Sequence, residues 1–409
     1  MERTWRWFGK KDKITLAMLK QIGVEGIVTA LHDVPNGEVW TREKIRDLRE
    51  YIESYGMRWS VVESLPVVES IKYAGPDRDE QIERYKESLK NLSLEGIHTI
   101  CYNFMPVLDW ARTDLLHDNP NGASNLYFSH AQFAYFDICI LKREGAEKEW
   151  SEDVLKQVDE LKRTMTPEDD HKLVENIIVK TQGFVSGNIK EDDEHPVELF
   201  RQLLALYKGI SKEQLRENMR YFLAAIMPTC EEYGMYMCVH PDDPPFPILG
   251  LPRIVTCDED IQWFLNAVDN PHNGLTFCAG SLSAGAHNNV VELAKKYADR
   301  TWFVHLRSCH IFPNGDFTEA SHLGGRADLI ELARIFEKTE NSQNIGDVPA
   351  WRLPMRVDHG MTMLGDEDRG YNAGYSFLGR MFALGQVQGI LATVDRELGI
   401  EYKQPGFFD

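Results

Sequence analysis

No Cys-x-x-Cys pair occurs in this 409-residue sequence, although it contains seven cysteines. The absence of such pairs argues against a zinc ribbon. An odd number of cysteines, several of them inside predicted strands or helices, is also untypical of a disulfide framework. The pattern indicates free thiols in a reducing environment, and we therefore expect a cytoplasmic protein.

Long apolar runs and excess positive charge are lacking too. We find no signal-peptide core behind Met1 and no stretch long and apolar enough to span a bilayer, so no membrane partner is expected. The 45 basic residues are outnumbered by 64 acidic ones, and the net charge of −19 repels nucleic acid. A small anionic substrate is still compatible with this charge, because a metal ion and local arginines can reverse the sign inside a pocket.

The sequence does contain eight short runs of β-branched and aromatic residues with few charges, typical of strands covered on both faces. The runs comprise residues 4–8, 26–31, 59–64, 99–104, 236–240, 275–278, 301–306 and 354–358. Amphipathic segments between many of them have helix-capping residues at Thr15 and Thr41. Residues 211–214 and 256–259 have the pattern of capping boxes.

Strands that alternate with helices predict a parallel sheet, and eight of each predict closure. We therefore expect an α/β protein with a single (β/α)8 TIM-type barrel domain over residues 1–409. One interval, residues 106–234 between the fourth and fifth strands, is too long for an ordinary connection. Its charged, helix-like segments predict a helical insertion that also includes a barrel helix. We place this insertion over the barrel mouth or at an oligomer interface.

Each of the last four predicted strands ends on a side chain that binds transition metals, namely His240, Cys278, His305 and Asp358. Taken singly, a histidine or cysteine in an apolar run is more often a core residue. Their shared position favours a site, because the carboxyl ends of barrel strands meet at the face where active sites lie. We therefore predict one metal centre. Its ligand set suits Fe(II), Mn(II), Co(II) or Zn(II) and does not distinguish them.

Four further residues are candidates for substrate binding at the same face. Arg307 follows His305 by two positions and can hold a carboxylate in a bidentate manner, although a surface salt bridge explains it equally well. Asn103 ends the fourth strand and suits a hydrogen bond to a polyol. Trp110 is a pocket-wall or core residue, and His310 is either a substrate-facing residue or part of a loop.

Longer motifs extend over the whole chain: Thr4-Trp-Arg-Trp7, Val28-Thr-Ala-Leu-His32, Pro35-Asn-Gly-Glu-Val-Trp40, Trp59-Ser-Val-Val-Glu-Ser64, Cys101-Tyr-Asn-Phe-Met-Pro-Val-Leu-Asp-Trp110, His240-Pro-Asp-Asp-Pro-Pro245, Ile248-Leu-Gly-Leu-Pro-Arg253, His305-Leu-Arg307, Met355-Arg-Val-Asp-His-Gly360 and Gly374-Tyr-Ser. In these motifs the chain resembles the mannonate dehydratase family of hexuronate catabolism. The resemblance implies a barrel related to xylose isomerase. It also implies removal of water from D-mannonate to give 2-dehydro-3-deoxy-D-gluconate, with Mn(II) or Fe(II) as cofactor.

By the same resemblance, the metal ligands are His240, Cys278, His305 and Asp358, and acid/base catalysis falls to Tyr375, His359 and Asp358. Two positions depart from the family motifs, since Val357 and Ala373 stand where proline is expected. Tyr371 is a second tyrosine close to Tyr375 and competes with it for the same role. We expect a homo-oligomer, and specifically a dimer.

Two other functions are compatible with these residues. The first is another divalent-metal isomerase or epimerase of sugars or sugar acids on the same barrel. Such sites are usually richer in carboxylates, so the thiolate counts against it. The second is a catalytically silent barrel that binds sugar acids or stores metal, and the acid and base candidates argue against that.

Overall fold

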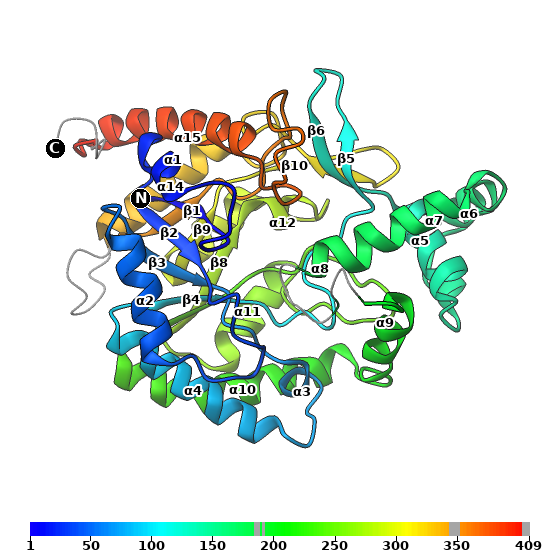
Figure 1. Cartoon of the computed structure of the whole chain (residues 1–409), viewed down its shortest axis with the longest axis horizontal. Helices are drawn as coiled ribbons and strands as arrows, with labels where there is room; N and C mark the ends of the chain where they lie inside the picture. Colours follow the sequence, from blue (N-terminus) through cyan, green and yellow to red (C-terminus); the bar gives the residue numbers. More distant parts are fainter. Residues whose placement is uncertain (184–188, 190–192, 343–351, 403–409) are drawn as a thin grey trace.

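The computed structural model describes residues 1–183, 189, 193–342 and 352–402. Its centre is a closed barrel of eight parallel strands in the order β1-β2-β3-β4-β7-β8-β9-β12 (Figure 1). Every predicted strand is confirmed, with small differences at the ends. The barrel strands are β1 Glu2–Arg6, β2 Gly26–Thr29, β3 Arg58–Glu63, β4 Thr99–Tyr102, β7 Tyr236–Val239, β8 Asn273–Cys278, β9 Thr301–His305 and β12 Pro354–Arg356.

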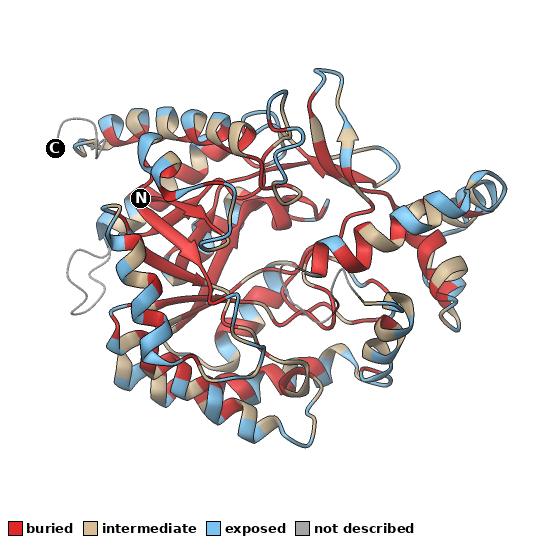
Figure 2. Ribbon diagram, viewed as in Figure 1, coloured by how far each residue is buried: buried red, intermediate tan, exposed pale blue. Residues whose placement is uncertain are grey.

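Helices surround the barrel, as the alternation of strand and helix predicts. The long ones are α1 Leu16–Gln21, α2 Arg42–Glu53, α4 Arg78–Leu94, α10 Lys212–Tyr233, α11 Asp258–Ala267, α13 Val290–Tyr297, α14 Leu329–Ser342 and α15 Phe377–Leu398, with shorter turns at α3 Glu69–Lys72, α12 Ala279–Ser283 and η4 Ala298–Arg300. Figure 2 shows that the barrel strands are buried, whereas the helices alternate buried and exposed residues. This is the burial expected of a sheet covered on both faces.

Thr15, Thr41 and Ser211 cap their helices as predicted, since their side chains accept from backbone N–H groups of the first turn. The capping box predicted at residues 211–214 is only half formed, because the side chain of Gln214 donates to Asn218. The prediction for residues 256–259 is wrong, because α11 begins only after Cys257. The hydroxyl and backbone N–H of Thr256 both donate to the buried carboxylate of Asp260, at 2.6 and 3.1 Å. Thr256 therefore donates hydrogen bonds to the Asp260 carboxylate and does not cap the helix.

The insertion between β4 and β7 is present, and most of its described part is helical. Its helices α6 and α7 extend away from the barrel (Figure 1). Before α10 it comprises β5 Asp114–Asp118, β6 Ser124–Phe128, α5 His130–Tyr135, η1 Phe136–Leu141, η2 Ala146–Glu149, α6 Glu152–Thr164, α7 Pro167–Val174, η3 Glu175–Lys180, α8 Thr181–Gly183 and α9 Pro196–Ala205.

The expectation of a purely helical insertion missed a second sheet. The hairpin β5–β6 pairs with another hairpin, β10 Cys309–Ile311 and β11 Phe317–Glu319, which follows β9. Together they form a four-stranded antiparallel sheet in the order β10-β11-β6-β5. This sheet, called the accessory sheet below, connects the insertion to the carboxyl end of a barrel strand.

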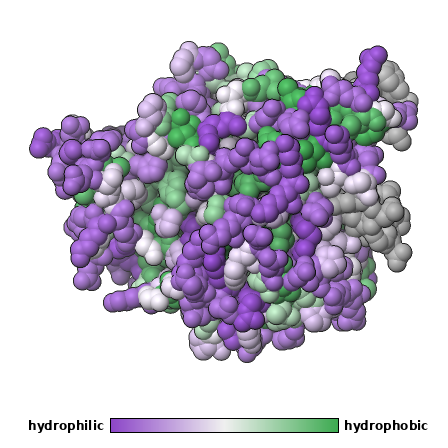
Figure 3. Space-filling view, turned by 180° about the vertical axis from the view of Figure 1, so that it is seen from behind, coloured by the Kyte–Doolittle hydropathy of each residue, from purple (hydrophilic) through white to green (hydrophobic). Residues whose placement is uncertain are grey.

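Helix α15 is long and apolar enough to cross a membrane by length and composition, which contradicts the expectation that no such segment exists. Leu384, Val387 and Leu391 of this helix are nevertheless buried in the protein core. A core helix meets the same criteria, so α15 is weak evidence for a membrane span. The face seen from behind is mostly hydrophilic, with hydrophobic residues in small groups (Figure 3).

Candidate metal centre and pocket

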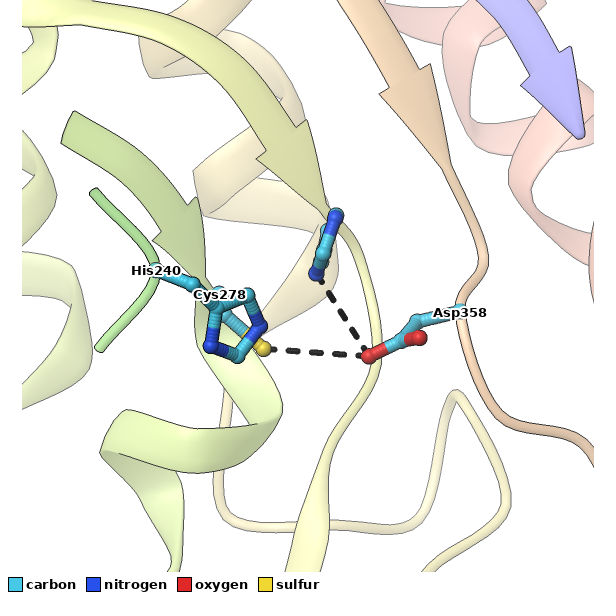
Figure 4. Close-up of side chains that lie close together, drawn as sticks. His240, Cys278 and Asp358 are labelled. Carbon is cyan, nitrogen blue, oxygen red and sulfur yellow. Dashed lines mark hydrogen bonds and ion pairs between the residues drawn. The ribbon is translucent and has the colours of Figure 1, made fainter. Parts of the chain in front are cut away.

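The four predicted metal ligands converge at the carboxyl ends of β7, β8, β9 and β12. One ligand atom from each of His240, Cys278, His305 and Asp358 lies within 4.8 Å of the others. Figure 4 shows the thiol of Cys278 and the carboxylate of Asp358 pointing toward each other, with Sγ 3.8 Å from Oδ2. The backbone of Asp358 has a φ of 59°, a costly conformation for a non-glycine residue that is typical of functional sites.

The hydrogen bonds of the two imidazoles bear on metal binding. His240 Nδ1 lies 2.7 Å from the carbonyl oxygen of Pro241. That acceptor fixes the proton on Nδ1 and leaves the Nε2 lone pair for an ion. His305 Nδ1 is buried and makes no hydrogen bond, although it lies 3.5 Å from Asp358 Oδ2. An orphaned buried nitrogen beside a carboxylate fits a cation at this point.

The other nitrogen of His305 has two polar neighbours. Arg356 Nε donates to Nε2 at 3.0 Å, and Glu63 Oε1 lies 3.6 Å from the same atom. A cation on Nδ1 leaves the proton of the neutral ring on Nε2, which then needs an acceptor. Glu63 Oε1 is an acceptor close to that nitrogen, whereas the guanidinium of Arg356 can only donate.

The charges of the ligands also suit a cation. Burial alone raises the pKa of Cys278, but Arg307 and His240 hold it well below its ordinary value, which favours the thiolate. Burial likewise opposes ionisation of Asp358, but Arg356 and His359 hold its pKa well below the usual range. The pKa of His240 is lowered by burial and raised more strongly by Cys278, to about 9, so a bound cation would displace the proton of this imidazolium. Two anionic and two imidazole ligands thus fit a divalent transition metal.

Two buried arginines hold these ligands in place. Arg307 donates from Nε to Asp358 at 2.5 Å, from Nη1 to Glu319 at 2.9 Å and from Nη2 to Asp243 at 2.7 Å. Arg356 donates to Asp358 Oδ1 and, at 2.8 Å, to Glu63. All three nitrogens of Arg307 are therefore engaged by carboxylates of the protein, which leaves less capacity for a substrate than the sequence suggested.

The acid/base candidates lie on one wall of the pocket. The ring centroids of His359 and Tyr375 are 5.1 Å apart, and Trp110 packs against His359 at the same distance. His359 Nδ1 lies 3.1 Å from Glu319 Oε1 on the accessory sheet, so its Nε2 is the nitrogen left for a substrate. Gly374, with a φ of 78°, lets this loop approach Leu126, because a Cβ there would lie 2.7 Å from Leu126 Cδ1.

Of the remaining candidate residues, some line the pocket and others do not. Asn103 lines the pocket and donates to Asp109 at 2.6 Å. Tyr375 also lines the pocket, whereas Tyr371 is only partly buried and is not among the lining residues. His310 is not brought to the pocket: it is exposed on β10 and packs against Phe312, because the chain turns into the accessory sheet after β9.

Several residues of the site were missed from the sequence: Arg6, Glu63, Asp109, Arg112, Glu319 and Arg356. Arg6, Glu63 and Arg356 are charged residues at the ends of apolar strands, a signal like the one that revealed Asp358. Glu319 has a weaker signal, the turn Pro313-Asn-Gly315 that precedes its strand. Burial of such charges requires partners or a ligand, so each marks the site.

This geometry defines a (β/α)8 barrel with a candidate centre for a divalent metal ion at the carboxyl ends of its strands. Residues 1–401 match the family described as D-mannonate dehydratase (UxuA). The chain belongs to this family. A mannonate dehydratase of Marinomonas sp. (strain MWYL1) is 44% identical over 98% of this chain and 99% of its own length. One of Chromohalobacter salexigens is 40% identical over 98% and 100% of the two chains.

A solved structure supports the same assignment. The mannonate dehydratase of Streptococcus suis serotype 2 superposes with a TM-score of 0.78 at 32% identity, over 99% of this chain and 97% of the other. A D-tagatose 3-epimerase-like protein gives a TM-score of 0.51 at 9% identity, over 97% and 100% of the two chains. At that identity the likeness concerns the barrel fold alone and gives no support to an epimerase.

Proposed function

We propose that this protein removes water from D-mannonate to give 2-dehydro-3-deoxy-D-gluconate, with Mn(II) or Fe(II) held by His240, Cys278, His305 and Asp358. The observation that carries the proposal is the convergence of these four ligand atoms within 4.8 Å in a chain of this family. When bound, the ion supplies Lewis-acid stabilisation of the negative charge that develops beside the substrate carboxylate.

His359 is the proposed base that takes the proton from C2. Its Nδ1 faces the carboxylate of Glu319, which keeps the proton on that nitrogen, so Nε2, 3.8 Å from Asp358 Oδ1, is the nitrogen that accepts another. The same carboxylate stabilises the imidazolium once it forms. The pKa of Glu319 is raised by burial and lowered more strongly by Arg307, to about 2, so this carboxylate is ionised at neutral pH.

Tyr375 is the proposed acid that protonates the departing C3 hydroxyl. Burial, followed by the nearby charge of Asp358, raises the pKa of Tyr375, so the phenol keeps its proton at neutral pH. A protonated phenol suits donation to a leaving group and is a poor base. Asp358 is a weaker candidate for proton transfer, because its pKa is held well below the usual range, and we assign it to metal binding.

The proposal is tested with protein stripped by a chelator and reconstituted with Mn(II) or Fe(II). D-mannonate should lose one water and give a 2-keto-3-deoxy acid, detected by mass spectrometry and a carbonyl reagent. A product of unchanged mass would instead establish the isomerase or epimerase alternative. Metal binding without turnover of any aldonic acid would establish the catalytically silent alternative.

The remaining proposals concern the surroundings of the enzyme. The seven cysteines are free, in keeping with a cytoplasmic protein. We propose a homodimer, to be tested by sedimentation, and no nucleic-acid or membrane partner. We also propose that the insertion belongs to one barrel domain, because Arg112 of the insertion forms ion pairs with Asp243 and Glu319 at 2.6 and 2.8 Å.

A further inference from the structure

Arg6, the last residue of β1, is a buried arginine of the pocket, and no carboxylate of the described part of the chain pairs with its guanidinium. Its side chain is 6% exposed and lines the pocket together with Glu63, Tyr375 and Arg356. Among the described residues, its guanidinium forms no hydrogen bond or ion pair, and its Nη1 is buried without a partner. Its guanidinium carbon lies over the ring of Phe8, 5.1 Å from the ring centroid.

The other two arginines of the pocket are different. Arg307 is neutralised by Asp243, Glu319 and Asp358. Arg356 is neutralised by Glu63 and Asp358. Carboxylates of the protein therefore occupy both, whereas no carboxylate of the described residues lies within ion-pair distance of Arg6.

An unpaired guanidinium removed from water is costly, and a fold retains one where a ligand supplies the missing anion. Burial lowers the pKa of Arg6, which reflects this cost. A sugar acid carries one permanent negative charge, its carboxylate, and arginine binds carboxylates through two parallel N–H donors. We propose that Arg6 binds the carboxylate of the substrate, an inference that rests on the proposed function and reassigns the role suggested for Arg307.

An acceptor beside Arg6 supports a hydroxy acid as the ligand. Glu63 Oε1 accepts from Arg356, but its Oε2 is buried without a hydrogen bond. Arg6 and Glu63 influence each other electrostatically and yet form no ion pair. The pocket thus offers an unpaired donor and an unpaired acceptor, and a carboxylate with a neighbouring hydroxyl satisfies both.

The experiment compares Arg6→Met and Arg6→Lys with the wild type, all reconstituted with Mn(II). We expect Arg6→Met to raise KM for D-mannonate roughly 10- to 100-fold, the loss of a charge-assisted pair, and Arg6→Lys to recover part of it. Without substrate, the Tm of Arg6→Met should equal or exceed that of the wild type, because a desolvated charge is removed. Arg220→Met, an exposed change of equal charge on α10, is the control and should leave KM unchanged.

Two results would overturn the inference. One is a KM of Arg6→Met within twofold of the wild type. The other is a lower Tm in both Arg6 variants, together with an increase of Tm on addition of D-mannonate that is as large as in the wild type. Such a result identifies Arg6 as a structural residue. If the wild type fails to turn over mannonate, the proposed function fails separately. The role of Arg6 is then tested by the Tm shift that a panel of hydroxy acids produces. A Tm increase in the wild type but not in Arg6→Met supports carboxylate binding by Arg6, and equal increases refute it.

Discussion

Replacing Glu319 by glutamine is expected to destabilise the protein by about 3 kcal/mol and to lower kcat roughly 10- to 100-fold with little change in KM. Glu319 accepts from Arg112 at 2.8 Å, from Arg307 at 2.9 Å and from His359 at 3.1 Å. Removing one partner of a buried ion pair costs about 3 to 5 kcal/mol, and glutamine keeps one acceptor oxygen, which favours the lower end. The lowering of its pKa from 4.5 to about 2 gives about 3 kcal/mol independently.

The effect on kcat has a separate origin, since it acts through the orientation and tautomer of His359. Loss of a carboxylate that orients a functional histidine lowers activity roughly 10- to 100-fold. Stability is measured by urea unfolding, and kcat by formation of the keto acid at saturating Mn(II). Asp316→Asn is the matched control: Asp316 is a buried acceptor between β10 and β11, bonded to Tyr127 at 2.9 Å, and does not line the pocket. The Asp316→Asn variant should be less stable than the wild type, with an unchanged kcat.

A double-mutant cycle decides whether Glu319 acts through His359. In a His359→Gln background, Glu319→Gln should lower kcat far less than it does in the wild type, because the group it positions is gone. An equal reduction of kcat in both backgrounds would refute the proposal that Glu319 acts through His359. Its effect on kcat would then come from Arg307 or from general loosening of the pocket.

Three further predictions follow from the site. Cys278→Ser should weaken Mn(II) binding in equilibrium dialysis by more than the roughly 10- to 100-fold expected for a supporting residue, whereas Cys139→Ser should not, and equal affinities would remove the thiolate from the ligand set. Tyr375→Phe should retain the metal and lose roughly 10²- to 10⁴-fold in kcat; a change in KM alone would contradict its role as the acid. The metal-free protein should lose stability as pH falls from 4.5 toward 2, because Glu63 and Glu319, with pKa values lowered from 4.5 to about 2, must take up protons on unfolding. Urea unfolding across this range should show a shallower decline in Glu63→Gln, and an unchanged slope would exclude Glu63 as a contributor.

The sequence was sufficient for the barrel and for the convergence of the four candidate metal ligands, because both follow from one regularity. Parallel strands covered on both faces are short apolar runs, and a polar side chain at the end of such a run lies on the functional face. His240, Cys278, His305 and Asp358 all satisfy this rule. Their convergence was predictable without knowledge of any distance.

The accessory sheet did not follow from that rule, because its strands are short and mix polar with apolar residues. Two turns nevertheless signalled it. Pro120-Asn-Gly122 and Pro313-Asn-Gly315 each precede a strand, and Asn-Gly is a strong hairpin signal. In the structure, Gly122 and Gly315 have φ values of 80° and 89°. The pairing of these two hairpins joins distant segments, and no local pattern reveals it.

The partners of the arginines were equally unpredictable. For Arg307 the sequence left a substrate carboxylate and a surface salt bridge equally possible, because its three carboxylates come from three different connections, at Asp243, Glu319 and Asp358. Arg6 was not singled out from the sequence, because only the fold reveals that no carboxylate of the described residues is paired with it. Charge balance in a pocket is a property of the assembled molecule and cannot be assigned from spacing.

The accessory sheet has a consequence for how such enzymes can be recombined. Asn125 of β6 donates to the backbone oxygen of Glu319 at 2.6 Å, and Ser124 of the same strand pairs with Thr362. A chimaera that receives the insertion of a relative must therefore also receive the hairpin after β9. Without this hairpin, β6 of the grafted insertion would pair with a β11 from a different protein. Strand β11 carries Glu319, which contacts His359.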